Sequence, residues 1–218
     1  MLDIKILIII TFFSLVILVM ISSILWYKSP QKKYLKYFAL FSIFFLIGQV
    51  LTSSRNIIPD LLSIVIGNTL LVLGYIFLYI GIRDLLNLDA KWHNRYFIPI
   101  GVILLGFILF TFVYYNVAMR IVIFSVFCVI YGSIVTLMFL KKARKEFKVF
   151  DYISACLFFI GVVLFTVRII KASTIDLPAN YLSTTDLMIT LVYVYLFFMT
   201  LWLSVILIRT EIQTFLNK

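Results

Sequence analysis

Seven long apolar stretches occupy most of the 218 residues of this chain. A helix that crosses a bilayer needs roughly 20 mostly apolar residues, because each residue advances it by about 1.5 Å through a hydrocarbon layer about 30 Å thick. The stretches that meet or approach this length are Ile4–Tyr27, Leu35–Ser54, Leu61–Leu85, Phe97–Val113, Ile121–Leu140, Ile153–Ile170 and Leu187–Ile208. Lipid cannot satisfy backbone N–H and C=O groups, and the alternation typical of barrel strands is absent. The sequence therefore predicts an all-α membrane protein, a single seven-helix bundle over residues 1–218 whose tail covers residues 209–218.

The lysines and arginines gather at alternate connections between the apolar stretches, which predicts the orientation. Fourteen of the nineteen lie on one side: Lys28, Lys32, Lys33, Lys36, Arg83, Lys91, Arg95, Lys141, Lys142, Arg144, Lys145, Lys148, Arg209 and Lys218. The other side holds Lys5, Arg55, Arg120, Arg168 and Lys171. Because basic residues accumulate in cytoplasmic loops, we expect the N-terminus outside and the C-terminus in the cytoplasm.

The net charge of +10 sits in short loops beside the membrane, so we interpret it as a topology signal and expect membrane lipid, not nucleic acid, as a partner. The sequence contains no glycine-rich nucleotide loop, no zinc-protease or nucleophile motif and no paired carboxylates. Cys128 and Cys156 fall inside predicted spans, and His93 is the only histidine. We therefore expect no enzyme, no metal site and no cofactor.

A shift of 113 residues aligns GQVLTSSRNI, residues 48–57, with GVVLFTVRII, residues 161–170. It pairs Gly48 with Gly161 and Arg55 with Arg168, and it places the first two spans over the fifth and sixth. The pattern predicts parallel repeats in a three-plus-one-plus-three arrangement, as in many membrane folds. Chance is the alternative, because apolar matches arise easily between membrane helices.

The third span carries three small residues, Gly67, Gly74 and Gly81, at a spacing of seven that places them on one helix face. Small residues allow two helix backbones to approach closely, so we interpret these glycines as a helix-packing seam. Asn68 beside the seam and Gln49 in the second span are polar residues expected to face the bundle interior. They can serve either packing or ligand binding.

Charged residues on the predicted outer side are the best functional candidates. Arg55, Arg120 and Arg168 reach a similar depth, and Asp60 lies close to the first of them in sequence. Charges at bilayer depth usually face protein or a water-filled cavity, and arginine suits carboxylates and phosphates. We expect Arg55, Arg120 and Arg168 to bind a small anionic ligand with Asn68, Gln49 and Asp60, beneath a lid formed by the loop Lys171–Asp186. The alternative is that these arginines only anchor helix ends.

The segment SSRNIIPDLLSIVIGNTLLVLGYIFLYIGIRDLLN, residues 53–87, resembles the seven-helix membrane sensors at the N-terminus of bacterial GGDEF diguanylate cyclases. The matching positions are Arg55, Pro59, Asp60, Leu61, Ser63, Gly67, Asn68, Gly74, Tyr75 and Gly81. The resemblance implies a sensor in the bacterial inner membrane that passes a helix movement to a cytoplasmic output domain. The sequence departs from that family in having no GGDEF domain, so no cyclase activity is implied.

Two other functions stay open: a small-solute transporter of the three-plus-one-plus-three type, and a membrane effector or channel controlled by a cytosolic protein. Against the transporter, Pro30, Pro59 and Pro178 lie in predicted loops and Pro99 opens the fourth span, whereas such carriers use prolines within helices as hinges. The tail places Ile208, Ile212, Phe215 and Leu216 on one helix face. Such a stripe can join a partner helix of a cytoplasmic output protein or of a second copy of the chain. The alternative is that this short segment frays or contacts the lipid surface.

Overall fold

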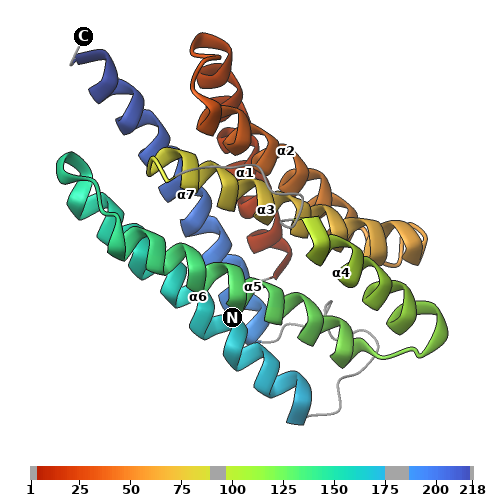
Figure 1. Cartoon of the computed structure of the whole chain (residues 1–218). Helices are drawn as coiled ribbons and strands as arrows, with labels where there is room; N and C mark the ends of the chain where they lie inside the picture. The colour runs from red at the N-terminus through yellow and green to blue at the C-terminus, as the bar shows by residue number, and fades with distance from the viewer. Residues whose placement is uncertain (1–3, 89–96, 175–186, 217–218) are drawn as a thin grey trace.

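The computed structural model describes residues 4–88, 97–174 and 187–216, and this part of the chain is helical without a β-strand (Figure 1). Its elements are α1 (Ile4–Lys28), α2 (Lys33–Ser53), the π-helical η1 (Leu61–Ile66) that continues as α3 (Gly67–Leu85), α4 (Ile98–Ile108) that continues as the π-helical η3 (Leu109–Val113), α5 (Val117–Lys141), the 3-10 turn η4 (Lys145–Phe147), α6 (Lys148–Thr174) and α7 (Leu187–Leu216).

Six helices in the described residues are long and apolar enough to cross a membrane, as predicted for six of the spans. The fourth predicted span forms the shorter apolar helix Ile98–Val113, so the count of seven crossings stays a prediction. Several helices extend beyond the predicted spans, because polar residues can continue a helix past its apolar part. Examples are α5, which begins at Val117, α6, which covers Lys148–Thr174, and α7, which continues to Leu216.

Large apolar side chains on the outside of the bundle indicate a lipid environment. On α1 the exposed residues recur every three or four positions, which places them on one helix face. They are Ile6, Ile9, Phe13, Ile17, Met20 and Ile24. The opposite face of α1 carries buried Leu15 and Leu18. An outward apolar face on this scale is unfavourable in water, so the described architecture is that of a multi-pass membrane protein.

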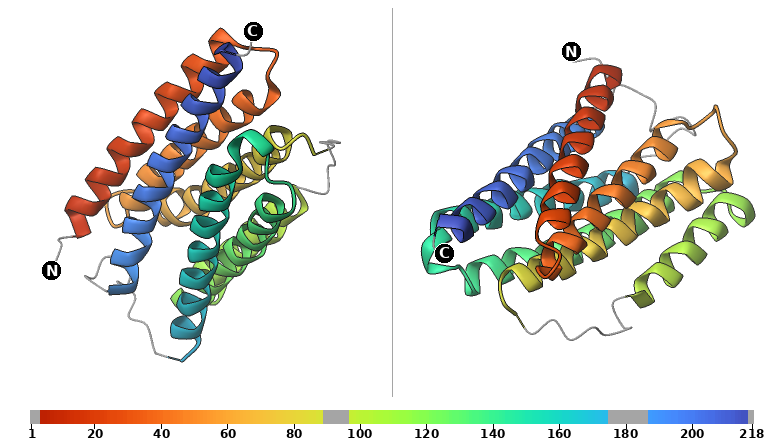
Figure 2. Two further views of the ribbon diagram at one scale, coloured as in Figure 1. Left: turned by 90° about the vertical axis from the view of Figure 1, so that its left-hand side faces the viewer. Right: turned by 90° about the horizontal axis from the view of Figure 1, so that it is seen from above.

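The helices form two units that touch each other sparsely. Helices α2 and α3 pack along their lengths, α1 lies between α2 and α7, and we call these four the four-helix unit. Helices α5 and α6 pack equally closely on each other and form the α5–α6 hairpin. Few contacts join the two units, through α3 with α5 and α6 with α7, and α4 lies at the edge against both (Figures 1 and 2).

Glycines set the separation of α2 and α3. A Cβ added to Gly48 would lie 2.9 Å from the backbone oxygen of Gly67, and one added to Gly67 would lie 2.9 Å from Thr52 Cγ2. Gly74 and Gly81 meet α2 at Phe41 and Phe38, so all three glycines of the predicted seam face α2. The missing side chains let the two backbones approach, which is the usual role of small residues in membrane helices.

The predicted repeat has one structural parallel and one difference. Gly48 on α2 faces α3, and its aligned partner Gly161 on α6 faces α7 at the Tyr195 hydroxyl. The packing extents differ, however, because α2–α3 contact is extensive whereas α6–α7 contact is small. The repeat therefore stays a prediction, with unequal packing in its two halves.

Substituting Gly48 by alanine should separate α2 from α3. The new methyl group would collide with the Gly67 carbonyl, which is backbone and cannot rotate away, so we expect Gly48→Ala to lower the free energy of unfolding by about 1–3 kcal/mol. Gly101→Ala in α4 is the matched control, because a Cβ there meets nothing within 4 Å. Denaturant unfolding in detergent micelles measures both variants. Equal effects at the two positions would contradict the packing role of Gly48.

The orientation can be tested with single cysteines in a Cys156→Ser background. Ile57 follows α2 and is 84% exposed, and Lys142 ends α5 at the opposite end of the bundle. We expect Ile57→Cys to react with a membrane-impermeant thiol reagent added to intact cells, and Lys142→Cys to react only after lysis. The reverse pattern would invert the predicted topology.

Candidate functional site

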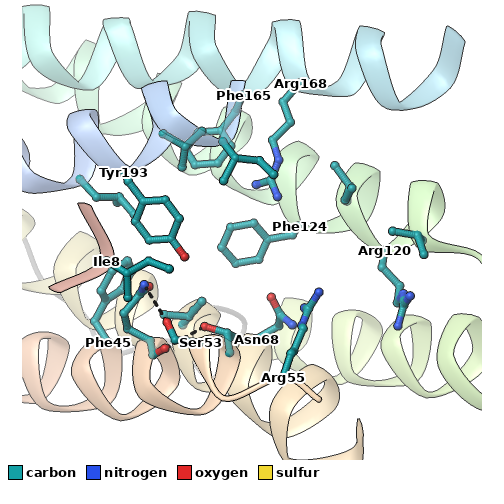
Figure 3. A pocket seen from close by; sticks show the side chains of 18 of the residues that line it. Ile8, Phe45, Ser53, Arg55, Asn68, Arg120, Phe124, Phe165, Arg168 and Tyr193 are labelled. Atoms are coloured by element: carbon teal, nitrogen blue, oxygen red, sulfur yellow. Dashed lines mark hydrogen bonds between the residues drawn. The ribbon is translucent and has the colours of Figure 1, made fainter. Parts of the chain in front are cut away.

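A cavity of about 330 Å³ lies at the end of the bundle where α2 and α6 finish and α1, α3, α5 and α7 begin. This is the end that the charge pattern predicts to be outside. Residues from both units line the cavity, so it lies between the four-helix unit and the α5–α6 hairpin (Figure 3). The exposed side chains of Lys5, Ser53 and Asn56 belong to its lining and mark the mouth.

Five of the six predicted ligand-binding residues line this one cavity: Arg55, Arg120, Arg168, Asn68 and Gln49. The sixth, Asp60, does not line it and is exposed at the start of η1. The Asp60 carboxylate still acts on Arg55, because its charge raises the pKa of that guanidinium. Residues 175–186, which include most of the expected lid, lie outside the described residues.

Sequence reasoning missed six polar residues of the lining: Lys5, Thr52, Ser53, Asn56, Tyr75 and Tyr193. Lys5 had a usable signal, since it is a basic residue at the outer end of the first span. Tyr193 had none, because an aromatic residue within an apolar span has no pattern that separates lining from packing. Figure 3 shows Tyr193 reaching into the cavity from α7, opposite the arginines.

A tight turn positions Arg55. Ser54 ends α2, and its carbonyl accepts backbone hydrogen bonds from Ile57 at 3.1 Å and Ile58 at 3.2 Å. Asn56 has φ of 66°, a left-handed conformation that asparagine tolerates better than most residues. The turn reverses the chain directly after α2, so Arg55 lies over the cavity between α2 and η1.

Arg120 is held by the start of α5. The Asn116 side chain caps this helix by accepting a hydrogen bond from the Met119 N–H at 3.0 Å. Arg120 follows one residue later and is only 6% exposed, with its guanidinium carbon 4.9 Å from the centre of the Tyr115 ring. A cation beside a helix N-terminus is unfavourable, because the helix dipole is positive there. The fold therefore adds positive potential to the cavity.

The arginines repel one another across the cavity. Burial, together with the charge of Arg120, lowers the pKa of the Arg55 guanidinium to about 10, and Arg168 contributes in the same direction. Arg55 lies past the end of α2 and stays charged at neutral pH. Figure 3 shows these three side chains approaching from α5, from α6 and from the turn after α2.

No acidic residue lines the cavity within the described part of the chain, although four basic residues do. The Nε of Arg55 and the Nη1 of Arg120 are buried and have no hydrogen-bond partner there. A buried, unsatisfied donor costs about 1–3 kcal/mol and more when charged. Such an arrangement attracts an anion, because a carboxylate or phosphate supplies both the missing charge and the missing acceptors.

At the opposite end of the bundle, the half-buried Arg144 has an acidic partner. Arg144 donates to the buried Asp151 carboxylate from its backbone N–H, its Nε and its Nη2, at 2.7, 3.1 and 2.7 Å. Lys32 pairs with Glu211 at 2.8 Å. The first pair includes the fully buried Asp151, and the second is partly exposed. That end therefore contains two acid–base pairs, whereas no acid lines the cavity among the described residues.

The two neutral polar residues deeper in the cavity bond to their own helices. The Asn68 side chain donates to the Ile64 carbonyl at 2.6 Å, and Gln49 Nε2 donates to Ser53 Oγ at 3.4 Å. Gln49 is buried. Their amides add polar surface beside the arginines without neutralising them.

The described residues contain no group of three or more His, Cys, Asp or Glu that could hold a metal ion. Comparison of the chain with protein-family models, curated proteins and solved structures gives no match. The functional interpretation therefore depends on the cavity itself.

Replacing Arg120 by methionine should stabilise the empty protein. The change removes a buried charge with an unsatisfied donor and keeps an apolar stem of similar length, so we expect the free energy of unfolding to rise by about 1 kcal/mol in a buffer low in small anions. Arg144→Met is the control with the opposite sign, because it leaves the buried Asp151 unpaired and should cost about 3 kcal/mol. A strong loss of stability on Arg120→Met would show that this guanidinium is already paired in the free protein.

Proposed function

We propose that this protein is a membrane receptor that binds a small anion in the cavity between its two units and passes the binding event to its cytoplasmic end. One observation carries the proposal: one guanidinium nitrogen of Arg55 and one of Arg120 are buried without a hydrogen-bond partner, beside a cavity whose described lining contains basic residues and no acid. A charge-assisted hydrogen bond contributes about 1.5–3 kcal/mol, so two or three such bonds are enough for selective binding of an anion.

The position of the basic residues suggests how binding acts on the fold. Arg55 belongs to the four-helix unit, whereas Arg120 and Arg168 belong to the α5–α6 hairpin. Without a ligand, the positive charges of the two units repel each other. An anion bound between them would attract both units and so replace the repulsion. Because few other contacts join the units, the bound anion would draw the hairpin toward the four-helix unit.

The core below the cavity favours a receptor over a channel. Phe38, Phe139, Leu203 and Leu207 are almost fully buried there, and Phe139 stacks on Phe158 with ring centres 6.0 Å apart. These side chains fill the core at that depth, and the buried hydroxyl groups beside them hydrogen-bond to one another, Ser14 with Thr200 and Ser22 with Ser42. A transporter would also need this core to open, and the described helices carry no internal proline that would act as a hinge.

The output would leave through the end of α7. Glu211 near this end bonds to Lys32 and to the Tyr34 hydroxyl, and Ile212 is 54% exposed. The predicted stripe continues to Phe215 and Leu216, whose side chains lie outside the described residues. We propose that a cytoplasmic output protein or a second copy of the chain binds this stripe, in line with the resemblance to bacterial inner-membrane sensors.

Anion binding can be measured by thermal unfolding in nanodiscs of zwitterionic lipid, with inorganic phosphate and acetate as probes. We expect both anions to raise the melting temperature, and Arg55→Gln or Arg168→Gln to weaken the apparent affinity at least tenfold. Lys142→Gln is the control, because it removes an exposed positive charge at the other end of the bundle. Equal stabilisation of all variants would mean that the anions act on general surface charge, and no stabilisation of the wild type would refute the proposal.

Transmission to the cytoplasmic end can be followed through Trp202. Its indole Nε1 donates to Ser154 Oγ at 3.0 Å and its ring stacks on Phe150, so it reports on the contact between α7 and α6. In a chain with Trp26→Phe and Trp92→Phe, we expect saturating phosphate to shift the Trp202 emission, and Arg55→Gln to abolish the shift. An unchanged emission despite proven binding would indicate that the two ends are not coupled.

A further inference from the structure

The apolar part of the cavity has no role in binding a simple anion. Its lining includes Phe45, Leu71, Tyr75, Phe107, Phe124, Phe165 and Leu196. Several of the rings hold one another in edge-to-face contact, with centres 5.4 Å apart for Phe45 and Tyr75 and 6.2 Å apart for Phe124 and Phe165. Rings fixed in this way present a preorganised apolar surface to a ligand.

The hairpin places the charged and apolar parts of the cavity in a fixed order. On α5, Phe124 follows Arg120 by one helical turn, and on α6, Phe165 precedes Arg168 by one turn. Both steps lead from the outer end toward the middle of the bundle, since α5 and α6 run in opposite directions. On the other side of the cavity, Phe45 precedes Ser53, the last residue of α2, by eight positions. At a rise of about 1.5 Å per residue, Phe45 therefore lies about 12 Å deeper in the bundle.

The volume exceeds what an inorganic anion needs. An apolar cavity of about 150 Å³ holds a benzene ring, and water enters a cavity only where it finds two to four polar partners. This cavity is about 330 Å³, and its aromatic part offers few such partners. Inorganic phosphate at the arginines would therefore leave the deeper part without contacts.

We infer that the ligand is a compact organic anion, with a carboxylate or phosphate bound by Arg55, Arg120 and Arg168 and an aromatic or short aliphatic body packed on Phe124, Phe165 and Tyr75. This inference rests on the proposed function and names its ligand class. A two-chain lipid carries the same chemistry but is too large for the cavity, so the ligand reaches it as a free organic acid.

Four probes separate the two parts of the site: acetate, phenylacetate, neutral 2-phenylethanol and inorganic phosphate, each titrated against the wild-type protein in zwitterionic nanodiscs. We expect phenylacetate to bind at least tenfold more tightly than either acetate or 2-phenylethanol. Equal affinity for acetate and phenylacetate would overturn the inference and leave the proposed anion receptor intact. Failure of every anion to bind would refute the proposed function itself, and so would equal binding of phenylethanol and phenylacetate.

Leu196→Phe tests the location of the apolar body. Leu196 lines the deep part of the cavity from α7 and is only partly buried, so the larger side chain should fill space that the phenyl group occupies. We expect the preference for phenylacetate over acetate to fall to less than threefold, with phosphate binding unchanged. An unchanged preference in a folded variant would place the phenyl group elsewhere and overturn the inference. If the variant does not fold, the wild-type ratios still decide the question.

Nanodiscs that contain phosphatidylglycerol test the lipid as an alternative source of the anion. We expect phenylacetate to retain its affinity within threefold in these discs, because the cavity excludes a two-chain lipid. Displacement of phenylacetate by the anionic lipid, with recovery in zwitterionic discs, would show that a membrane lipid occupies the site and would overturn the assignment to a free acid.

Discussion

The close contact of α2 with α3 determines the geometry of the site. Gly48 and Gly67 let the two backbones approach so closely that a Cβ on Gly48 would collide with the Gly67 carbonyl oxygen. The turn after α2 therefore lies close to the start of α3. That turn carries Arg55, while Gln49 and Asn68 lie on the two packed helices themselves. A bulkier residue at this contact would move three lining side chains at once. The glycines therefore act on binding only through the separation of the helices.

Arg144 at one end of the bundle differs from Arg55 and Arg120 at the other end in its hydrogen-bond partners. Arg144 has a buried carboxylate and three hydrogen bonds, which offset much of the cost of removing it from water. Arg55 and Arg120 each retain a buried nitrogen without a partner among the described residues. Purely structural arginines at helix ends would gain from pairing or from solvent contact. Charges that lose free energy in the empty protein are better explained by a ligand that completes them.

The sequence predicted the helical membrane architecture because span length and loop charge are direct consequences of the bilayer. It also grouped Arg55, Arg120 and Arg168, since basic residues at the apolar ends of spans share a depth. Nearness in sequence also grouped Asp60 with Arg55, and the Asp60 charge does raise the pKa of Arg55. Sequence alone could not show that the Asp60 side chain is exposed at the start of η1, outside the cavity lining. The aromatic residues of the cavity lining could not be predicted from the sequence, for another reason. In a chain with 22 phenylalanines, a ring that faces a cavity has the same sequence pattern as one that faces a neighbouring helix.

Charge repulsion across the cavity is large enough to matter for the relation between the two units. Two like charges separated by about 6–15 Å repel by about 1–3 kcal/mol at an effective dielectric constant of 20, and Arg120 and Arg168 both act on Arg55 in this sense. Coupling energies between distant sites are typically about 1–3 kcal/mol, so replacing this repulsion with attraction to a shared anion is of the right size to shift a conformational equilibrium. The opposing contacts at the other end are few, and they include Trp202 with Ser154 and the Arg209 guanidinium over Phe150. Because the α5–α6 hairpin is tightly packed internally, we expect it to respond to a change in charge as a single body, sliding on the apolar core that it shares with the four-helix unit.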